Sequence, residues 1–387
     1  MSTSTIVVVA ITVATVSCSA AHPAAPRQSS PLPSSSWSTT APGPAVGARS
    51  PALVWTPHRL PAGLAHYVAG LPGVAASVVV ANGTVWLPGG ASTPRGMAVP
   101  IDVSATDPHR FADVMPAAAA GLSHLQSGDV ALSRDSARLR QVKVGDTIRF
   151  PERTLRVAAI VSDRLIGDAE MMVTASDGQR LGVAPDRYLL VRPTSSAAWS
   201  TIAAAIRRWL ARGALIRLRA PGAARWLREG DAVMPPLLEK LRFGEFAANP
   251  HATVAGYLTI DPAWRARHLE TAVVPILGNV TCNRAYIPSL RAALRSVVRR
   301  GLARLIDGHD YGGCWAPRLI PGEPGESISH HAYGSAIDIN VSANEQGSRP
   351  HQDPRVVRIF ASFGLTWGGD WLVPDGMHFE DVSARPS

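Results

Sequence analysis

Short apolar runs of strand length recur between residues 51 and 215, separated by Gly, Pro, Asp and Asn. Two of them, Ala76–Val80 and Thr84–Leu87, flank the dipeptide Asn82-Gly83, and both of its residues tolerate positive φ. This pattern predicts a two-residue hairpin turn. Further strands are predicted at Val142–Val144, Thr147–Phe150, Leu155–Val161, Met171–Ala175 and Tyr188–Val191, and a helix at Ala197–Ala211. The region therefore predicts a mixed α/β domain.

The pattern changes from about residue 216. Pro288 precedes apolar positions spaced three or four apart as far as Leu305, which predicts a helix with proline near its first position. Asp353-Pro354 predicts the start of a second helix, which Gly364 closes. Strands are predicted at Ala336–Val341 and Leu365–Trp367. This mixture predicts an α+β domain.

The first residues predict export from the cytoplasm. Ile6–Val16 is an apolar run about as long as the core of a signal peptide and too short for an ordinary membrane-spanning helix. Two interpretations of Cys18 stay open: it is the lipidated first residue of a mature lipoprotein, or it is lost in a signal cleaved near Ala20-Ala21. We expect a signal over 1–21, a Ser/Pro/Ala-rich disordered tether over 22–50, and domains over 51–215 and 216–387.

Composition narrows the class of partner. The 387 residues carry 38 basic and 29 acidic side chains, for a net charge of +9. Lys143 and Lys240 are the two lysines, and the arginines are spread thinly without a run of like charges. No nucleic-acid-binding motif accompanies this charge, so we expect no nucleic-acid partner and a basic surface suited to an anionic cell envelope.

Three cysteines are present in the chain. If Cys18 is lipidated or removed, Cys282 and Cys314 remain as an even pair in an oxidising compartment, which predicts a disulfide between them. Two unrelated buried thiols are the alternative.

Two short segments near the C-terminus hold a set of metal-ligand residue types. SHHAYGSAIDIN contains His331 and Asp338, and DGMHFED contains His378. Imidazole and carboxylate groups suit zinc, and three protein ligands leave a fourth position for water. Asp338 lies between Ile337 and Ile339, where a carboxylate would be costly to bury without a cation. Asp375 precedes His378 by three residues and is the candidate general base.

These motifs, with WGGDW at Trp367–Trp371 between them, resemble the zinc D-alanyl-D-alanine carboxypeptidase family, which includes VanY-type and VanX-type enzymes and L-alanyl-D-glutamate peptidases. The resemblance covers roughly 278–380. It implies that His331, Asp338 and His378 bind Zn²⁺, that Asp375 is the catalytic base, and that the domain has a small antiparallel sheet with flanking helices.

The resemblance also implies an upstream arginine that holds the substrate carbonyl or carboxylate. Arg318 is the candidate and Arg284 the alternative. Ser329, Trp367, Trp371 and Glu380 are expected to line or support the site. The stretch 128–161 loosely resembles the extracytoplasmic core domain of ABC permeases of the macrolide-exporter type, whose role in this chain stays open between an interaction module and a spacer.

Together these features predict an envelope-located zinc metallopeptidase, secreted or anchored through a lipoprotein N-terminus. Its substrate would be the peptidoglycan stem peptide, cleaved at amide bonds involving D-amino acids. The sequence does not decide between carboxypeptidase and endopeptidase. The alternative is a non-catalytic envelope protein that binds cell-wall peptide and recruits a membrane partner through residues 51–215.

Overall fold

The computed structural model describes residues 50–382, apart from 91–92 and 232. The predicted signal, most of the tether and Cys18 lie outside this part of the chain. Within it, the strands form an eleven-stranded sheet, a two-stranded sheet and a four-stranded sheet. The strands of the large sheet are β1 (Ala52–Trp55), β2 (Val74–Pro88), β3 (Ala98–Thr106), β4 (Asp129–Ser133), β5 (Thr147–Arg149), β6 (Thr154–Val161), β7 (Met171–Thr174), β8 (Tyr188–Pro193), β9 (Arg217–Arg219), β10 (Ala248–Pro250) and β11 (Leu258–Ile260).

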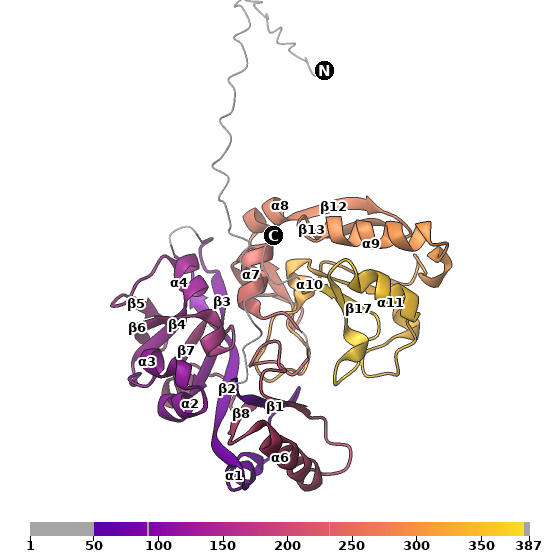
Figure 1. The fold of residues 1–387 in the computed structure, drawn as a ribbon. Coiled ribbons are helices and arrows are strands. Elements are labelled where there is room, and N and C mark those ends of the chain that lie inside the picture. The colour runs from indigo at the N-terminus through magenta and orange to yellow at the C-terminus, as the bar shows by residue number, and fades with distance from the viewer. Residues whose placement is uncertain (1–49, 91–92, 232, 383–387) are drawn as a thin grey trace, which may run out of the picture. The chain divides into compact units, whose positions relative to one another are not determined.

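The large sheet has the order β5-β6-β4-β7-β3-β2-β8-β1-β9, and β10 joins it through β3 (Figure 1). Parallel pairs at β3–β7 and β4–β6 are mixed with antiparallel pairs. Its helices are α1 (Leu64–Ala69), α2 (Pro108–Val114), α3 (Ala119–Leu122), α4 (Arg134–Arg140), α5 (Ala175–Arg180) and α6 (Ser196–Trp209), with short 3₁₀ turns at Pro116–Ala118 and Asp163–Ile166. Helices α1 and α6 pack on the sheet through one apolar cluster, and α2 and α3 pack on it through another. Residues 51–215 supply most of this mixed, β-rich region as predicted, and the three strands β9, β10 and β11 come from beyond residue 215.

The predicted hairpin at Asn82-Gly83 is wrong, because both residues lie inside the fifteen-residue strand β2. The Asn82 side chain is buried and donates to Asp102 Oδ1 at 3.0 Å, so this asparagine links β2 to β3. At Gly83, a β carbon would lie 3.2 Å from the carbonyl oxygen of Gly325. The glycine therefore lies where another segment, at Gly325, packs closely on the strand. Glycine inside a strand often marks such a close approach.

Other predicted elements are shifted or absent. Val142–Val144 is a turn and not a strand, because Gln141 ends α4 in the left-handed conformation and Val144 is left exposed. The helix predicted over 197–211 runs from Ser196 to Trp209. The helix predicted from Pro288 to Leu305 is α9 (Ile287–Arg299) followed by a 3₁₀ turn at Ala303–Leu305, since Gly301 has φ of 68° and interrupts it.

The C-terminal region contains the predicted small antiparallel sheet with flanking helices. The strands of this sheet are β14 (Tyr311–Gly313), β15 (Ala336–Ile339), β16 (Leu365–Trp367) and β17 (His378–Asp381), and they follow the order β14-β15-β17-β16. A separate two-stranded sheet consists of β12 (Leu269–Val274) and β13 (Gly278–Asn283). The helices are α7 (Pro236–Phe243), α8 (Pro262–His268), α9, α10 (His330–Tyr333) and α11 (Pro354–Ala361), with 3₁₀ turns at Val341–Ala343 and Gly368–Asp370.

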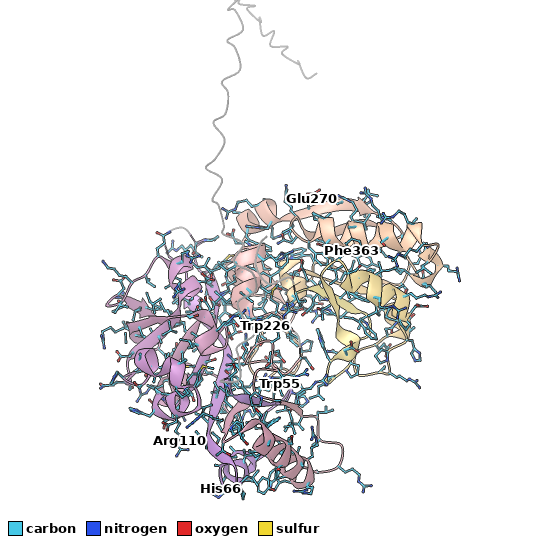
Figure 2. The ribbon with its side chains drawn as sticks, in the orientation of Figure 1. Trp55, His66, Arg110, Trp226, Glu270 and Phe363 are labelled. Atoms are coloured by element: carbon cyan, nitrogen blue, oxygen red, sulfur yellow. A yellow bond between two sulfur atoms is a disulfide. The ribbon has the colours of Figure 1, made fainter. Side chains whose placement is uncertain are left out.

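One apolar cluster underlies this region, from Trp226 to Val382, and partly buried Phe363 packs against it (Figure 2). Asp353 caps α11 as predicted, accepting from the backbone N–H of Arg355. Among the described residues, no helix is long and apolar enough to cross a membrane.

Buried ion pairs join this region to the large sheet. Lys240 on α7 lies 2.6 Å from the Glu170 carboxylate, and both side chains are almost fully buried. Arg228 lies 2.9 Å from Asp102 on β3. Removing one partner of a buried pair leaves an uncompensated charge, so these contacts fix how the two regions pack.

Candidate metal centre

The two segments with metal-ligand residues meet in the small sheet. Helix α10 carries His331 and ends at Gly334, whose φ of 67° and tight packing exclude a side chain: a β carbon there would lie 2.6 Å from the backbone nitrogen of Asn283. The chain then enters β15, which carries Asp338 directly opposite His378 on β17. A short helix, a glycine turn and one cross-strand pair therefore bring the three side chains together.

The three side chains converge on one point. His331 Nε2 lies 3.1 Å from His378 Nδ1 and 3.2 Å from Asp338 Oδ2, and His378 Nδ1 lies 3.1 Å from Asp338 Oδ1. Ligand atoms about 2.0–2.1 Å from a tetrahedral zinc ion are about 3.3 Å apart. The spacing of these atoms fits a small divalent cation, and the cluster could hold a metal ion.

Hydrogen bonds on the outer sides of both histidines orient the rings. His331 Nδ1 lies 2.9 Å from the carbonyl oxygen of Cys314, and His378 Nε2 lies 3.1 Å from Glu380 Oε2. The other ring nitrogens, His331 Nε2 and His378 Nδ1, face the Asp338 carboxylate. Two imidazole nitrogens and a carboxylate that face each other in a buried site suit a cation, and such hydrogen-bond partners on the outer nitrogens are typical of metal-bound histidine.

Behind His378 lies a buried group of charged side chains, in which the sequence had indicated Glu380 but not His330 or Glu239. Glu380 also lies 2.7 Å from His330 Nδ1, and His330 Nε2 donates to the carbonyl of Met234 at 3.1 Å. Although burial opposes it, the carboxylates of Glu239 and Glu380 raise the pKa of His330 to about 9. Although burial alone would raise it, His330 and His378 hold the pKa of Glu380 down at about 2. The carboxylate that orients His378 is therefore ionised at neutral pH.

Asp375 lies one turn before His378, whose backbone N–H donates to the Asp375 carbonyl at 3.2 Å. Its Oδ1 is buried and has no hydrogen-bond partner among the described residues. Burial raises the pKa of Asp375, while His378, His331 and Arg318 oppose the rise. A carboxylate that is poorly solvated, unpartnered and close to the cluster has the properties of a general base.

Gly368 fixes the position of this turn. Its carbonyl accepts from the backbone N–H of Asp375 at 2.9 Å, and a β carbon on Gly368 would lie 2.8 Å from the Asp375 carbonyl oxygen and 3.3 Å from the His378 β carbon. No side chain fits without moving the base or the ligand.

We expect Gly368→Ala to lower peptide hydrolysis by roughly 10-fold or more, because displacement of a reacting group by about 1 Å can cost about 100-fold in rate. Steady-state kinetics of the purified full chain checks this. Gly90→Ala is the matched control, because a β carbon at Gly90 meets nothing within 4 Å. Equal rates for Gly368→Ala and its control would contradict the assigned role of the turn.

The two candidate arginines are placed differently. Arg318 precedes α10, its carbonyl accepts from the Ser329 N–H at 3.0 Å, and its charge lowers the pKa of Asp375. Arg284 is exposed, and its guanidinium bonds with the carbonyls of Leu269 and Ala266. The arrangement favours Arg318 as the arginine near the reacting groups.

The remaining expected residues surround the cluster. Ser329 is buried immediately before α10. Trp367 Nε1 donates to the Gly376 carbonyl at 2.8 Å and so braces the turn between Asp375 and His378. The ring of Trp371 lies 5.1 Å from the ring of His378, measured between centroids.

The predicted disulfide joins Cys282 on β13 to Cys314 after β14. It holds in place the segment whose carbonyl, that of Cys314, accepts the His331 ring N–H. The disulfide therefore contributes both to stability and to the orientation of a candidate ligand.

Replacing both cysteines by alanine is expected to lower the free energy of unfolding by roughly 3 kcal/mol, the usual effect of removing a crosslink over a loop of this length. We also expect weaker zinc binding, because the Cys314 segment loses its anchor. Urea unfolding and zinc titration of the double variant test both effects. An unchanged unfolding midpoint together with unchanged zinc affinity would contradict this role.

The segment that holds the candidate metal centre matches a known protein family. Residues 323–381 match the family model described as D-alanyl-D-alanine carboxypeptidase. The matched segment contains His331, Asp338, His378 and Asp375, whereas Arg318 and Cys314 precede it. No curated protein matches the chain significantly.

Among solved structures, the extracellular domain of the noncanonic ABC-type transporter YknZ from Gram-positive bacteria is 13% identical, with a TM-score of 0.30, 42% of this chain covered and 92% of that chain. The periplasmic region of MacB from Actinobacillus actinomycetemcomitans is 10% identical, with a TM-score of 0.30, 42% of this chain covered and 85% of that chain. The family match supports a peptidase in the C-terminal region of this chain.

Proposed function

We propose that the protein is a zinc metallopeptidase that hydrolyses amide bonds involving D-amino acids in peptidoglycan stem peptides. The observation that carries the proposal is the convergence of three side chains: His331 Nε2 lies 3.1 Å from His378 Nδ1, and the two Asp338 oxygens lie 3.2 and 3.1 Å from these nitrogens. The site lies in the segment that matches the carboxypeptidase family model.

His331, Asp338 and His378 would hold the zinc ion. When bound, zinc supplies Lewis acidity, which lowers the pKa of a coordinated water towards neutrality and polarises a carbonyl group. By accepting the outer ring N–H groups, the Cys314 carbonyl and the Glu380 carboxylate would keep each metal-bound imidazole in the tautomer that presents its lone pair to the ion.

Asp375 would act on protons. In this proposal its unpartnered Oδ1 accepts a proton from the attacking water and later returns it to the leaving amine. The raised pKa of Asp375 suits both steps, because a pKa closer to neutral pH lets the same carboxyl group accept a proton and return it. Arg318 would stabilise the negative charge that develops on the scissile carbonyl, or hold a terminal carboxylate.

The proposal also covers location and organisation. The apolar run Ile6–Val16 and the polar stretch after it support export to the bacterial cell envelope, as a secreted protein or one anchored through lipidated Cys18. The peptidase domain would occupy 216–387, and the preceding domain over 51–215 would be extracytoplasmic with it.

Digestion of purified muropeptides by the zinc-loaded full chain, followed by mass spectrometry, tests the function. We expect loss of a terminal D-alanine residue from pentapeptide stems if the enzyme is a carboxypeptidase, and two stem fragments if it is an endopeptidase. Binding of muropeptides without any product would instead support the non-catalytic cell-wall-binding protein.

A further inference from the structure

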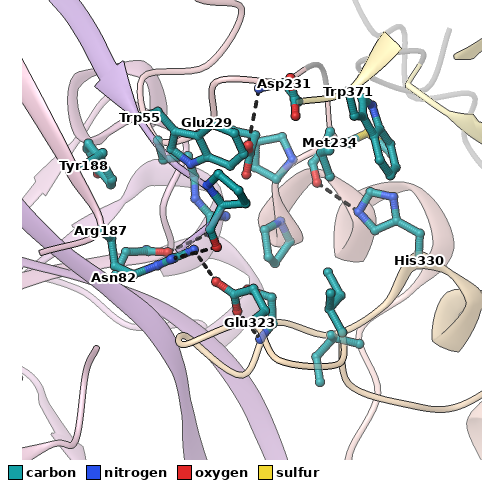
Figure 3. A pocket seen from close by; sticks show the side chains of 18 of the residues that line it. Trp55, Asn82, Arg187, Tyr188, Glu229, Asp231, Met234, Glu323, His330 and Trp371 are labelled. Carbon is teal, nitrogen blue, oxygen red and sulfur yellow. Dashed lines mark hydrogen bonds and ion pairs between the residues drawn. The ribbon is translucent and has the colours of Figure 1, made fainter. Parts of the chain in front are cut away.

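A pocket beside the candidate metal centre is closed on one side by residues of the large sheet. Trp55 on β1, Asn82 on β2 and Tyr188 on β8 line it, together with Glu229 from the segment that follows β9. His330 and Trp371 line the opposite side (Figure 3). Residues more than two hundred positions apart in the sequence thus form one cavity.

The pocket borders the metal cluster through two of its lining residues. His330 directly precedes the candidate ligand His331, and the Trp371 ring contacts the His378 ring. The indole N–H of Trp371 is buried and has no hydrogen-bond partner among the described residues. These two residues place the pocket next to the cluster, with an unpartnered donor on Trp371.

Most of the charged side chains that line the pocket are already paired. Arg187 bonds with Glu323, and Arg228 lies 2.9 Å from Asp102 and donates to the Asn82 side chain at 2.9 Å. The remaining pairs are Asp231 with Arg217 at 2.7 Å, and His330 with Glu380 at 2.7 Å.

Glu229 is the exception. Among the described residues it has no ion pair, and the contact made by its carboxylate is with the backbone N–H of Asp231 at 3.3 Å. Burial raises the pKa of Glu229 to about 8, with Arg228 opposing the rise, so the ionised carboxylate is poorly stabilised in the free protein. A cation placed in the pocket would supply the missing charge.

Trp55 lines the same pocket as Glu229 (Figure 3). The residue after Glu229, Gly230, packs so tightly on Trp55 that a β carbon would lie 2.5 Å from the indole ring. This contact fixes the backbone that follows Glu229 against Trp55. An aromatic face attracts a cation such as an ammonium group, and a carboxylate in the same pocket adds to that attraction.

We propose that Glu229 binds a primary ammonium group of the peptide substrate in this pocket, and so determines which stem peptides the enzyme prefers. The inference rests on the proposed function, because it takes stem peptides as the substrate. The ammonium group would belong to the diamino residue of the stem. Because Trp55, Asn82 and Tyr188 line the pocket, the large sheet would then form part of this binding site.

Two stem pentapeptides that differ at the third residue, lysine in one and norleucine in the other, test the proposal with the zinc-loaded full chain. We expect kcat/KM to be roughly 10-fold or more higher for the lysine peptide, because a hydrogen bond to a charged group contributes about 1.5–3 kcal/mol. Glu229→Gln should bring the ratio close to one, and Glu229→Asp should restore part of it. Glu270→Gln is the matched control, since Glu270 is exposed on β12, and it should keep the wild-type ratio (Figure 2).

Equal kcat/KM values for the two peptides in the wild-type protein would overturn the inference and leave the proposed function standing. A ratio that persists in Glu229→Gln would also overturn it. If neither peptide is hydrolysed, calorimetric titration measures the binding affinity of the same two peptides and decides whether the pocket binds the ammonium group. Tighter binding of the lysine peptide, lost in Glu229→Gln, would support the pocket although the proposed function had failed, and equal binding would overturn the inference.

Discussion

Asp338→Asn is expected to abolish stoichiometric zinc binding and to lower stem-peptide hydrolysis by more than about 100-fold. Asp338 supplies the one anionic ligand of the three, and its two oxygens lie 3.1 and 3.2 Å from the nitrogens of His378 and His331. Asparagine keeps the shape of the side chain and removes its charge. Since replacing even an outer-shell partner typically lowers metal affinity or activity about 10–100-fold, loss of a ligand charge should have a larger effect.

Metal content of the dialysed variant, measured by mass spectrometry, checks this result, and hydrolysis rates are measured on the same sample. Asp353→Asn is the control, because Asp353 is the N-cap of α11 and its contacts are with Arg355. Circular dichroism shows whether both variants are folded. A folded Asp338→Asn protein that keeps one zinc ion per chain with near wild-type affinity would contradict the ligand assignment.

Asp375→Asn is expected to have a different signature, in which hydrolysis is lost and the metal is kept. The Asp375 carboxylate is not part of the converging ligand set, and its Oδ1 has no hydrogen-bond partner among the described residues. Removing a general base typically lowers kcat by about 100-fold to 10,000-fold. We therefore expect a fall in kcat of this size, with zinc content and peptide affinity close to wild type.

Single-turnover kinetics and zinc analysis of the same preparation measure both properties. Asp370→Asn provides a control for the loss of one negative charge nearby, because Asp370 is exposed in the 3₁₀ turn after β16. Retention of kcat within a few-fold in Asp375→Asn would reject this residue as the base. Retained peptide binding with lost turnover would separate catalysis from mere cell-wall binding.

The sequence predicted the components of the cluster because they lie in two short segments with strong local patterns. His331 and Asp338 are seven residues apart with a glycine turn between them, and Asp375 precedes His378 by one turn. The disulfide between Cys282 and Cys314 was predicted from the number of cysteines and the compartment, and it is confirmed.

The sequence indicated Ser329, Trp367, Trp371 and Glu380 as supporting residues, but other supporting groups were not predictable in the same way. The Cys314 carbonyl is a backbone group, and Glu239 and Glu229 come from distant segments in which no motif marks them. For His330, the adjacent pair of histidines was a signal, yet the sequence does not tell which partner each ring meets. These assignments depend on tertiary packing.

The error at Asn82-Gly83 has the same origin. Local turn propensity predicted a hairpin, but the burial of Asn82 against Asp102 and the approach of Gly325 to Gly83 keep the strand continuous. Tertiary contacts override a local preference of this size.

In the proposed function, stem-peptide hydrolysis depends on one zinc ion held by His331, Asp338 and His378. The decisive experiment is titration of the metal-stripped full chain with zinc, with hydrolysis measured at each addition. We expect no hydrolysis without metal and a linear rise that levels off at one equivalent of zinc. Hydrolysis that is equal before and after stripping, or a protein that takes up no stoichiometric zinc and shows no hydrolysis at any zinc level, would contradict it.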